Sequence, residues 1–592
     1  MKKVLSREEI QSEYKWNLEL IYKSPSLWEK AYNKVKSDIA HISDYREKLN
    51  DKEKLIEFIR LEESISLELG KLIVYSHMKS HEDLRISKHQ EYAARADVLS
   101  TSFAEATAFY APEILRIPES VLKSFIDDDR LKLYTFHFEE LTHLKSHTLS
   151  PEQEELLARA SEIARISDNT FSMFTDADMK FPTITDEDGD KIELTEERYY
   201  KLNRSKNRRV RKAAFKGLFE TYSKYKNTFA ALYQGSVRGD LFYSNSRKYE
   251  SCLQASLHSD NVPLCVYDNV INCANEYAHV LHDYMKLRKH VLKLKELHMY
   301  DLNIPLLEEP ETDISYEEAV EIVIEGLKPL GNEYCKVLRR GINEKWVDVY
   351  ESEGKRKGAY SWGSYGTSPY ILLNYNGTLR DVFTLAHEMG HSLHSYWTHK
   401  TQPQVYGDYT IFLAEVASTT NEMLLIRYLL KNRPKERKWL LNYGLDMVRT
   451  TLFRQAMFAE FERTTHTMTE NGDILTHESL CDLWKELNAK YYGPDMIIDN
   501  LIEIEWARIP HFYSAFYVYK YVTGFVSACS LSQQILEHGD EARAKYLNFL
   551  SKGGSNWPLD ILKEAGVDLY SAAPFENAIK MFKSWLTEWR NS

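Results

Sequence analysis

Two histidines and a glutamate stand at the spacing that a metal-dependent hydrolase needs on one helix. His387-Glu388-Met389-Gly390-His391 follows the pattern H-E-x-x-H. If this segment is helical, His387 and His391 lie one turn apart, about 6 Å along the axis, so both imidazoles can reach one metal ion. Glu388 projects from the adjoining face, where it can accept a proton from a water that zinc polarises. The motif therefore predicts a zinc site with Glu388 as the general base.

The motif by itself does not establish a zinc site. With 20 histidines in 592 residues, the pattern is expected by chance in about one such chain in twenty. The alternative interpretation is a core helix whose two histidines are simply hydrogen-bonded. Catalytic zinc has three protein ligands and an open fourth position, so a suitable third ligand distinguishes the two interpretations.

The third metal ligand must come from outside the motif. His394 lies about 10 Å along the helix axis from His387, too far for these two and His391 to bind one ion. Glu415 stands in an apolar run, 412–419, which begins a second helical pattern that can fold back beside the first. A lone glutamate there needs a buried partner. We therefore expect Glu415 to be the third zinc ligand, the alternative being a buried ion pair.

Three further side chains could support the metal ligands without touching the ion. Glu422 lies seven residues after Glu415 on the same face of its helix, and Asp381 lies near the start of the metal helix. Such carboxylates often accept a hydrogen bond from the second ring nitrogen of a ligating histidine. We expect Glu422 and Asp381 to orient imidazoles, and His394 to be a packed neighbour of the site.

A cluster of aromatic residues follows much later in the chain. One histidine and four tyrosines lie between His511 and Tyr521. Because the chain has 39 tyrosines, one interpretation is aromatic core with hydroxyls that reach out to partners. The functional interpretation is that His511 and one or two tyrosines donate hydrogen bonds to the oxyanion formed when water attacks a carbonyl. Tyr517 and Tyr521 share a helix face at i, i+4 and are the tyrosine candidates.

The elements that must position these residues are predicted to be mainly α-helical. The chain has 23 Gly and 16 Pro in 592 residues, about half the average usage, so residues that break helices are scarce. Amphipathic helices are expected at 55–69 and 91–110. Thr378 is a suitable N-cap for the metal helix, with Asp381 at the capping-box position. Gly390 would let a neighbouring backbone approach that helix closely.

Short strands are expected at two places. Residues 358–362 and 370–375 combine aromatic and β-branched residues between Gly, Ser and Pro signals, which predicts a small β-sheet just before the metal helix. Residues 181–185 and 191–194 flank an acidic turn and predict a surface hairpin. The basic run 204–212 lies in an acidic chain, so we interpret it as the solvated face of a helix and not as a nucleic-acid patch.

Three sections of one continuous body are predicted. They are an N-terminal helical lobe at 1–115, an intermediate helical region with the hairpin at 116–200, and a catalytic region at 201–592. Prolines punctuate the chain near these boundaries, but no fixed-period repeat or low-complexity linker separates independent domains.

Composition excludes several classes of protein. Hydrophobic residues at 43% and charged residues at 28% exclude a disordered, collagen-like or disulfide-scaffold chain. The net charge of −12 disfavours general binding to nucleic acid or anionic membranes. The six cysteines form no CxxC pair, and the first ten residues are not followed by an apolar run. We therefore expect a cytoplasmic protein.

Several segments together resemble oligoendopeptidase F, a thimet-oligopeptidase-like family of zinc metallopeptidases. The segments are 358–364, 369–378, 387–394, 412–419 and 508–513. By motif, the resemblance covers roughly residues 200 to 592. It implies a mainly α, elongated multi-helix body with a deep central substrate channel and a small β-sheet next to the H-E-x-x-H helix. Such a channel would admit short peptides and exclude folded proteins.

The same resemblance assigns roles to individual residues. It implies one Zn²⁺ per chain, with His387, His391 and Glu415 as ligands and Glu388 as the base. His511 with a neighbouring tyrosine would stabilise the oxyanion. Phe516 stands where a five-residue offset from His511 would place a tyrosine, so the choice between Tyr517 and Tyr521 is open.

The resemblance also assigns the substrate-binding strand. The segment containing Gly358, Ala359 and Tyr360 would pair with the substrate backbone as an added β-strand. Short peptides are the expected partners, and the oligomeric state is not predicted.

Two other functions are compatible with the sequence. A zinc carboxypeptidase on a related helical body would need a site for the terminal carboxylate of the peptide. A non-catalytic, peptide-binding helical protein with an accidental H-E-x-x-H would hold no stoichiometric zinc. Product mapping on an end-blocked peptide and a metal assay separate these alternatives from the endopeptidase.

Overall fold

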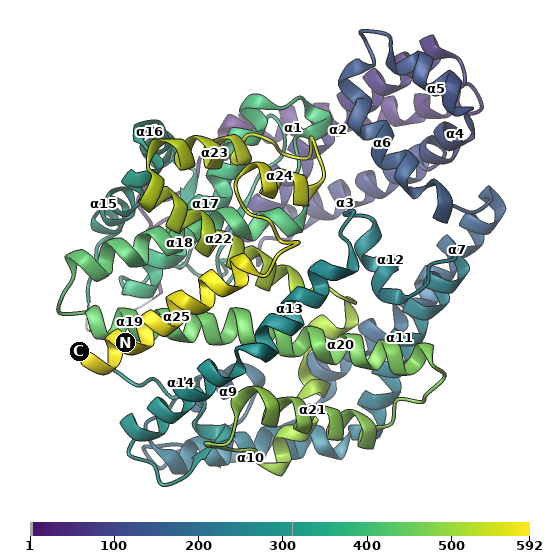
Figure 1. Ribbon diagram of the computed structural model, residues 1–592. Helices are drawn as coiled ribbons and strands as arrows, with labels where there is room; N and C mark the ends of the chain where they lie inside the picture. Colours follow the sequence, from purple (N-terminus) through teal and green to yellow (C-terminus); the bar gives the residue numbers. More distant parts are fainter. Residues whose placement is uncertain (1–3, 311) are drawn as a thin grey trace. The chain divides into compact units, whose positions relative to one another are not determined.

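The computed structural model describes residues 4–310 and 312–592. Helices dominate, and the strands among the described residues are only two or three residues long, which confirms the predicted mainly α class (Figure 1). None of the described helices combines the length and the apolar character that crossing a membrane requires.

The chain divides into two compact units, each assembled from three separate stretches of sequence. Unit 1 comprises the described residues within 1–148, 310–432 and 527–567. Unit 2 comprises those within 149–309, 433–526 and 568–592. The sections predicted from the sequence, at 1–115, 116–200 and 201–592, are each a single stretch of chain, whereas each unit combines three stretches.

Unit 1 contains a helical array and one sheet. Its helices are α1 (Pro25–Ala40), α2 (Lys52–Glu82), α3 (Ser87–Thr107), α4 (Tyr110–Arg116), α5 (Glu119–Ile126), α6 (Thr135–His143), α15 (Tyr316–Leu327), α16 (Asn332–Asn343), α17 (Leu379–Thr401), α18 (Ile411–Asn432), α23 (Asp540–Leu550) and α24 (Pro558–Glu564). Its strands are β4 (Val347–Asp348), β5 (Tyr360–Trp362) and β6 (Tyr370–Leu372). The expected helices at 55–69 and 91–110 correspond to α2 and α3.

Unit 2 is also helical. Its helices are α7 (Pro151–Ala164), α8 (Ile166–Met173), α9 (Glu196–Leu202), α10 (Arg208–Lys224), α11 (Lys226–Ser246), α12 (Cys252–His258), α13 (Leu264–Glu276), α14 (Ala278–Val291), α19 (Arg437–Val448), α20 (Arg454–Glu470), α21 (His477–Tyr492) and α25 (Ala573–Asn591). Its strands are β1 (Thr183–Thr185), β2 (Lys191–Glu193), β3 (Leu297–His298) and β7 (Met496–Ile497). Helix α22 (Tyr519–His538) contributes residues to both units. β1 and β2 pair antiparallel, which confirms the predicted hairpin.

The sheet of unit 1 leaves one strand at its edge. The strand order is β4-β6-β5, with β4 parallel and β5 antiparallel to β6. The register places Ser361 of β5 opposite Ile371 of β6. β6 is buried along its length, whereas the β5 residues are only partly covered. The predicted sheet at 358–362 and 370–375 is confirmed, and β5 presents unpaired backbone groups along its free edge.

Helices α17 and α18 lie side by side in unit 1 (Figure 1). Thr378 caps α17 in the predicted capping box with Asp381. A Cβ atom at Gly390 would lie 2.5 Å from Cα of Ser418 and 2.8 Å from the carbonyl oxygen of Ala417. Only glycine allows this approach, as predicted, because any side chain would push the two helices apart. The close contact brings the H-E-x-x-H residues next to the first turns of α18.

The basic run at 204–212 is not simply a solvated helix face. Arg211 donates to the carboxylate of Asp301 over 2.6 Å, and Arg208 donates to the same carboxylate over 2.8 Å. Asp301 is fully buried and Arg211 is nearly so. That part of the prediction is wrong, because a buried carboxylate far along the chain needs cationic partners. Lys212 and Arg209 are exposed, as expected.

Candidate active site

Three potential metal ligands converge between α17 and α18. The ligand atoms of His387, His391 and Glu415 all lie within 4.8 Å of one another. Oε2 of Glu415 is 3.5 Å from Nε2 of His387 and 3.9 Å from Nε2 of His391. These separations exceed a normal hydrogen bond, so the donor atoms face a shared space. Two imidazole nitrogens and one carboxylate oxygen form a donor set typical of catalytic zinc.

The carboxylate of Glu422 accepts a hydrogen bond from His387. Its Oε1 lies 2.6 Å from Nδ1 of His387, which leaves Nε2 free to act as a ligand. Burial lowers the pKa of His387, but Glu422, Glu388 and Glu415 together raise it to about 9. The surrounding carboxylates therefore favour a positive charge at this point. Glu422 thus lies within hydrogen-bonding distance of the second ring nitrogen of a candidate ligand, which is the position expected for it.

His391 faces the start of α18, where the backbone of Ala414 lies near its ring. Burial lowers the pKa of His391 to about 3, and the proximity of His387 adds to this effect. His391 is therefore neutral at neutral pH, the form in which imidazole binds metals.

Glu388 lies beside the three ligands and is 7% exposed. Burial raises its pKa to about 7; the charge of His387 opposes this, while Glu415 and Glu422 reinforce it. The backbone of Ser361, in β5, lies near the carboxylate and lowers its pKa slightly, against the effect of burial. Oγ of Ser361 is 2.8 Å from Oγ of Ser392 in α17, so the strand is tied to the metal helix at this point.

Family comparison identifies the class of protein that carries this arrangement. Residues 201–581 match the family described as Peptidase family M3, and residues 113–181 match the one described as Oligopeptidase F. The chain belongs to peptidase family M3. It is a metallo-endopeptidase, as its resemblance to oligoendopeptidase F predicted.

Individual relatives of this M3 peptidase align over nearly its whole length. Oligopeptidase PepF of Bacillus subtilis (strain 168) is 46% identical, with 98% of this chain and 88% of the relative covered. An oligoendopeptidase F homolog of Lactococcus lactis subsp. lactis (strain IL1403) is 42% identical, with 98% of each covered. The crystal structure of oligoendopeptidase-F from Enterococcus faecium superposes with a TM-score of 0.76 at 36% identity, with 96% of this chain and 98% of that chain covered.

Two predicted supporting residues of the M3 peptidase have other contacts. The carboxylate of Asp381 accepts from the backbone N–H groups of Thr378 and Asn376, at the start of α17. The ring of His394 stacks on Tyr409 at 3.7 Å between centroids, and neither of its nitrogens has a hydrogen-bond partner among the described residues. Asp381 therefore caps the helix and orients no imidazole through its described contacts, which corrects the expectation. His394 is a packed neighbour, as expected.

The second aromatic cluster lies in unit 2. The hydroxyl of Tyr521 is 3.5 Å from Nε2 of His511, which stands in a short 3₁₀-helix, η12 (Pro510–Tyr513). The ring of Tyr517 lies 6.3 Å from that of His511 and 5.4 Å from that of Tyr521. The structure thus brings the three predicted residues together. Tyr517 precedes α22, however, so the two tyrosines do not share one helix face as predicted.

A strained residue shapes the loop between these aromatic side chains. Phe516 has φ of 57°, and its N–H donates to the buried Oε1 of Glu462 over 3.0 Å. A bulky residue in the left-handed region costs about 1–3 kcal/mol and is found mostly at functional sites. Phe516 therefore sets the turn that presents Tyr517, and offers no hydroxyl of its own.

Two kinds of support for the site were not predicted from the sequence. Oγ of Ser418 donates to Oε2 of Glu415 over 3.1 Å, one turn along α18. The i, i+3 spacing of a serine after a candidate ligand could have indicated this contact. The contacts of Ala414 with His391 and of Ser361 with Glu388 use backbone atoms. Contacts through backbone atoms do not depend on residue type, so the sequence could not indicate them.

Removal of the Glu422 carboxylate is expected to weaken metal binding. Glu422→Ala leaves Nδ1 of His387 without its acceptor and should lower zinc affinity about 10- to 100-fold, whereas Glu422→Gln keeps an acceptor and should have a smaller effect. Competition with a chromogenic chelator measures the affinity. Glu351→Gln, at an exposed position in the same unit, is the control. Equal affinities in all four proteins would contradict the role of Glu422.

Proposed function

We propose that this M3 peptidase holds one zinc ion per chain through His387, His391 and Glu415 and cleaves internal bonds of short peptides. The convergence of the three donor atoms on two adjoining helices is the observation that carries the proposal. When bound, zinc supplies the positive charge that polarises a water molecule and the scissile carbonyl. The names oligopeptidase and oligoendopeptidase of its relatives support short peptides as the substrate class.

Glu388 is the general base in this proposal. Its carboxylate is buried beside the ligands and close to the backbone of Ser361. It accepts a proton from the attacking water and later donates it to the leaving amine. No covalent bond between the protein and the peptide is required.

The free edge of β5 is the proposed binding site for the substrate backbone. Tyr360 begins this edge, and Gly358 and Ala359 lead into it. Asn374 holds the segment by donating to the carbonyl oxygen of Gly358 over 2.8 Å. A peptide that pairs with an edge strand gains backbone hydrogen bonds without any requirement for particular side chains. Ser361 links the same strand to Glu388, so the paired peptide would lie beside the base.

His511 with Tyr517 or Tyr521 is proposed to stabilise the oxyanion. Tyr517→Phe and Tyr521→Phe each remove one of the two hydroxyls. The variant that lacks the hydroxyl that stabilises the oxyanion should show kcat lowered about 100-fold with little change in KM. His511→Ala should show a similar loss. Tyr513→Phe, whose ring stacks on Phe171, is the matched control. Near-normal kcat in His511→Ala would contradict the assignment.

Product mapping tests the proposed reaction. A peptide blocked at both ends should be cut internally by the zinc-loaded protein, cleavage should stop on removal of zinc with a chelator, and added zinc should restore it. Removal of single residues from unblocked C-termini, with no cleavage of the blocked peptide, would favour the carboxypeptidase alternative.

A further inference from the structure

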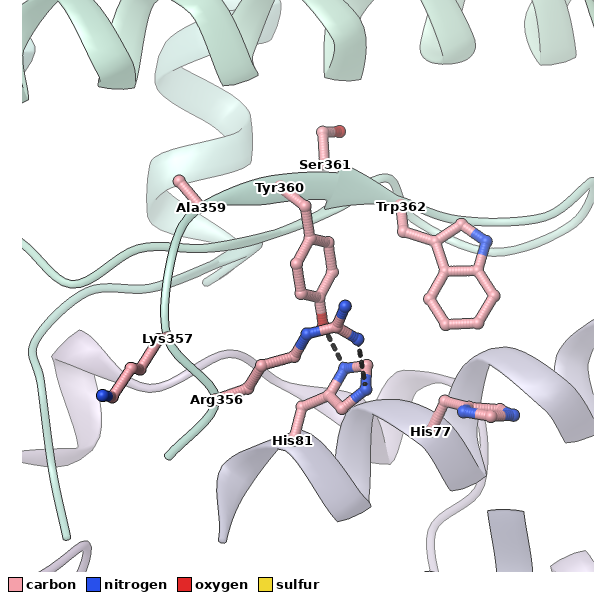
Figure 2. Close-up of a pocket in the computed structure, with 8 residues that line it drawn as sticks. All are labelled: His77, His81, Arg356, Lys357, Ala359, Tyr360, Ser361 and Trp362. Carbon is pink, nitrogen blue, oxygen red and sulfur yellow. Dashed lines mark hydrogen bonds between the residues drawn. The ribbon is translucent and has the colours of Figure 1, made fainter. Parts of the chain in front are cut away.

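A pocket of about 390 Å³ lies beside the edge strand β5, on the face opposite the metal helix. Ser361 points toward α17, where its Oγ contacts Ser392. Tyr360 and Trp362 point the other way, toward His81 and His77 of α2 (Figure 2). This alternation is the normal consequence of strand geometry. The pocket is therefore a second site on the same strand, apart from the metal ligands.

Hydrogen bonds in the pocket fix which groups can donate. Arg356 donates to Nε2 of His81 over 2.8 Å, so Nε2 carries the lone pair. The proton of His81 must then be on Nδ1, which lies 2.7 Å from the hydroxyl oxygen of Tyr360 and donates to it (Figure 2). Burial lowers the pKa of His81 to about 4, and Arg356 adds to this effect, which is consistent with the neutral ring. The hydroxyl proton of Tyr360 remains available to a ligand.

The pocket carries positive charge without an acidic partner. Neither Arg356 nor Lys357 forms an ion pair with any carboxylate of the described residues. The guanidinium of Arg356 lies 5.6 Å from the centre of the Tyr360 ring. Asp97 is hydrogen-bonded to His77 over 2.8 Å. The carboxylates of Asp348 and Glu82 also act on Tyr360, but they are paired with Lys355, Arg7 and Lys79. Two cations and a phenolic donor at one pocket form a site suited to an anion.

Strand pairing would deliver an anion to this pocket. A peptide that pairs with the free edge of β5 projects alternate side chains to opposite faces of the sheet. If one side chain of the bound peptide faces α17, the next side chain of the peptide therefore projects toward Arg356, Lys357 and Tyr360. The side chains of Glu388 and Ser392, which lie on the α17 side of the strand, carry no positive charge.

We propose, on the basis of the proposed function, that this pocket binds a carboxylate of the paired peptide. The carboxylate is the side chain of Asp or Glu, or the free C-terminus of the peptide. The enzyme then prefers peptides with a negative charge at one register position, which is a specificity that the zinc site cannot supply.

A charge scan of the substrate tests the proposal. One Glu is moved through every position of an end-blocked, internally quenched peptide, and each peptide is matched by its Gln counterpart. The zinc-loaded wild type should prefer Glu about tenfold in kcat/KM at one position, or at two positions separated by one residue. A second peptide pair, with a C-terminal acid or amide, distinguishes a terminal carboxylate from a side chain.

Variants assign the preference to the pocket. Arg356→Gln and Lys357→Gln should each reduce the Glu/Gln ratio, the double variant should bring it to about one, and Arg356→Lys should retain part of it. Lys357 is exposed and has no contact among the described residues. A lower Glu/Gln ratio in Lys357→Gln therefore cannot result from misfolding, which makes this variant the check on the Arg356 variants. Lys30→Gln on α1 removes the same charge from an exposed position and should leave the ratio unchanged.

The outcomes separate this inference from the proposed function. If the wild type cleaves Gln peptides but shows no Glu preference at any position, the pocket proposal is wrong while the endopeptidase stands. The same conclusion follows if a preference exists but survives in the double variant. If no peptide of the set is cut by zinc-loaded protein, the proposed function fails, and the pocket proposal fails with it.

Discussion

Glu388→Gln is expected to retain one zinc ion per chain and to lower kcat/KM for an internally quenched peptide about 1,000-fold. Glutamine has the size of glutamate and fits the same buried position, so the local structure is preserved. It cannot accept a proton from water. The rate and the zinc content are measured on the same preparation, because the prediction joins a retained metal to a lost reaction.

Glu388→Asp is the matched variant. It keeps a carboxylate but withdraws it by one methylene, so its rate should fall between those of the wild type and Glu388→Gln. If the glutamine variant hydrolysed the peptide at a near-normal rate, Glu388 would not be the base.

His391→Ala is expected to lose both the metal and the activity. Only His387 and Glu415 would remain of the three converging donors, fewer than catalytic zinc sites use. Zinc should raise the Tm of the wild type, because a ligand that binds only the folded state stabilises it. The same zinc concentration should leave the Tm of His391→Ala unchanged, and elemental analysis after dialysis should find little zinc.

His399→Gln provides the control for this second prediction. His399 lies two turns further along α17 and contacts the ring of Tyr365 instead of the site. That variant should keep its zinc and its activity. Stoichiometric zinc in dialysed His391→Ala would show that His391 is not a ligand.

Local signals in the sequence predicted the metal helix well. Thr378 and Asp381 form the capping box, and the i, i+4 spacing places His387 and His391 on one face. Glu415 could be predicted because a lone carboxylate in an apolar helix requires a partner. Gly390 was informative because a missing side chain allows only one kind of packing.

Asp381 shows where residue type was ambiguous. A carboxylate near a helix start can either cap the helix or bind a histidine on it. Capping prevailed because the first N–H groups of a helix have no partner within it. The hydroxyl of Thr378 accepts the N–H of Asp381 in the first turn, and the Asp381 carboxylate in return accepts the N–H groups of Thr378 and Asn376, which precede the helix.

Contacts between distant parts of the chain were beyond sequence reasoning. Arg211 and Asp301 are 90 residues apart, and neither position alone indicates that they form a buried pair. The proximity of Ser361 to Glu388 and the hydrogen bonds from Arg356 to His81 and from His81 to Tyr360 depend on tertiary packing. Each unit also combines three separate stretches of chain, an arrangement that no linker or composition change marks.

Zinc-edge X-ray absorption on purified, zinc-loaded protein tests the central claim most directly. The account predicts about one zinc per chain, two imidazole ligands and one or more oxygen ligands at about 2.0–2.2 Å. His391→Ala, reconstituted with excess zinc, should lack that two-imidazole signature. A sulfur ligand at about 2.3 Å, or a wild-type protein that retains no zinc, would contradict a metal site built from His387, His391 and Glu415.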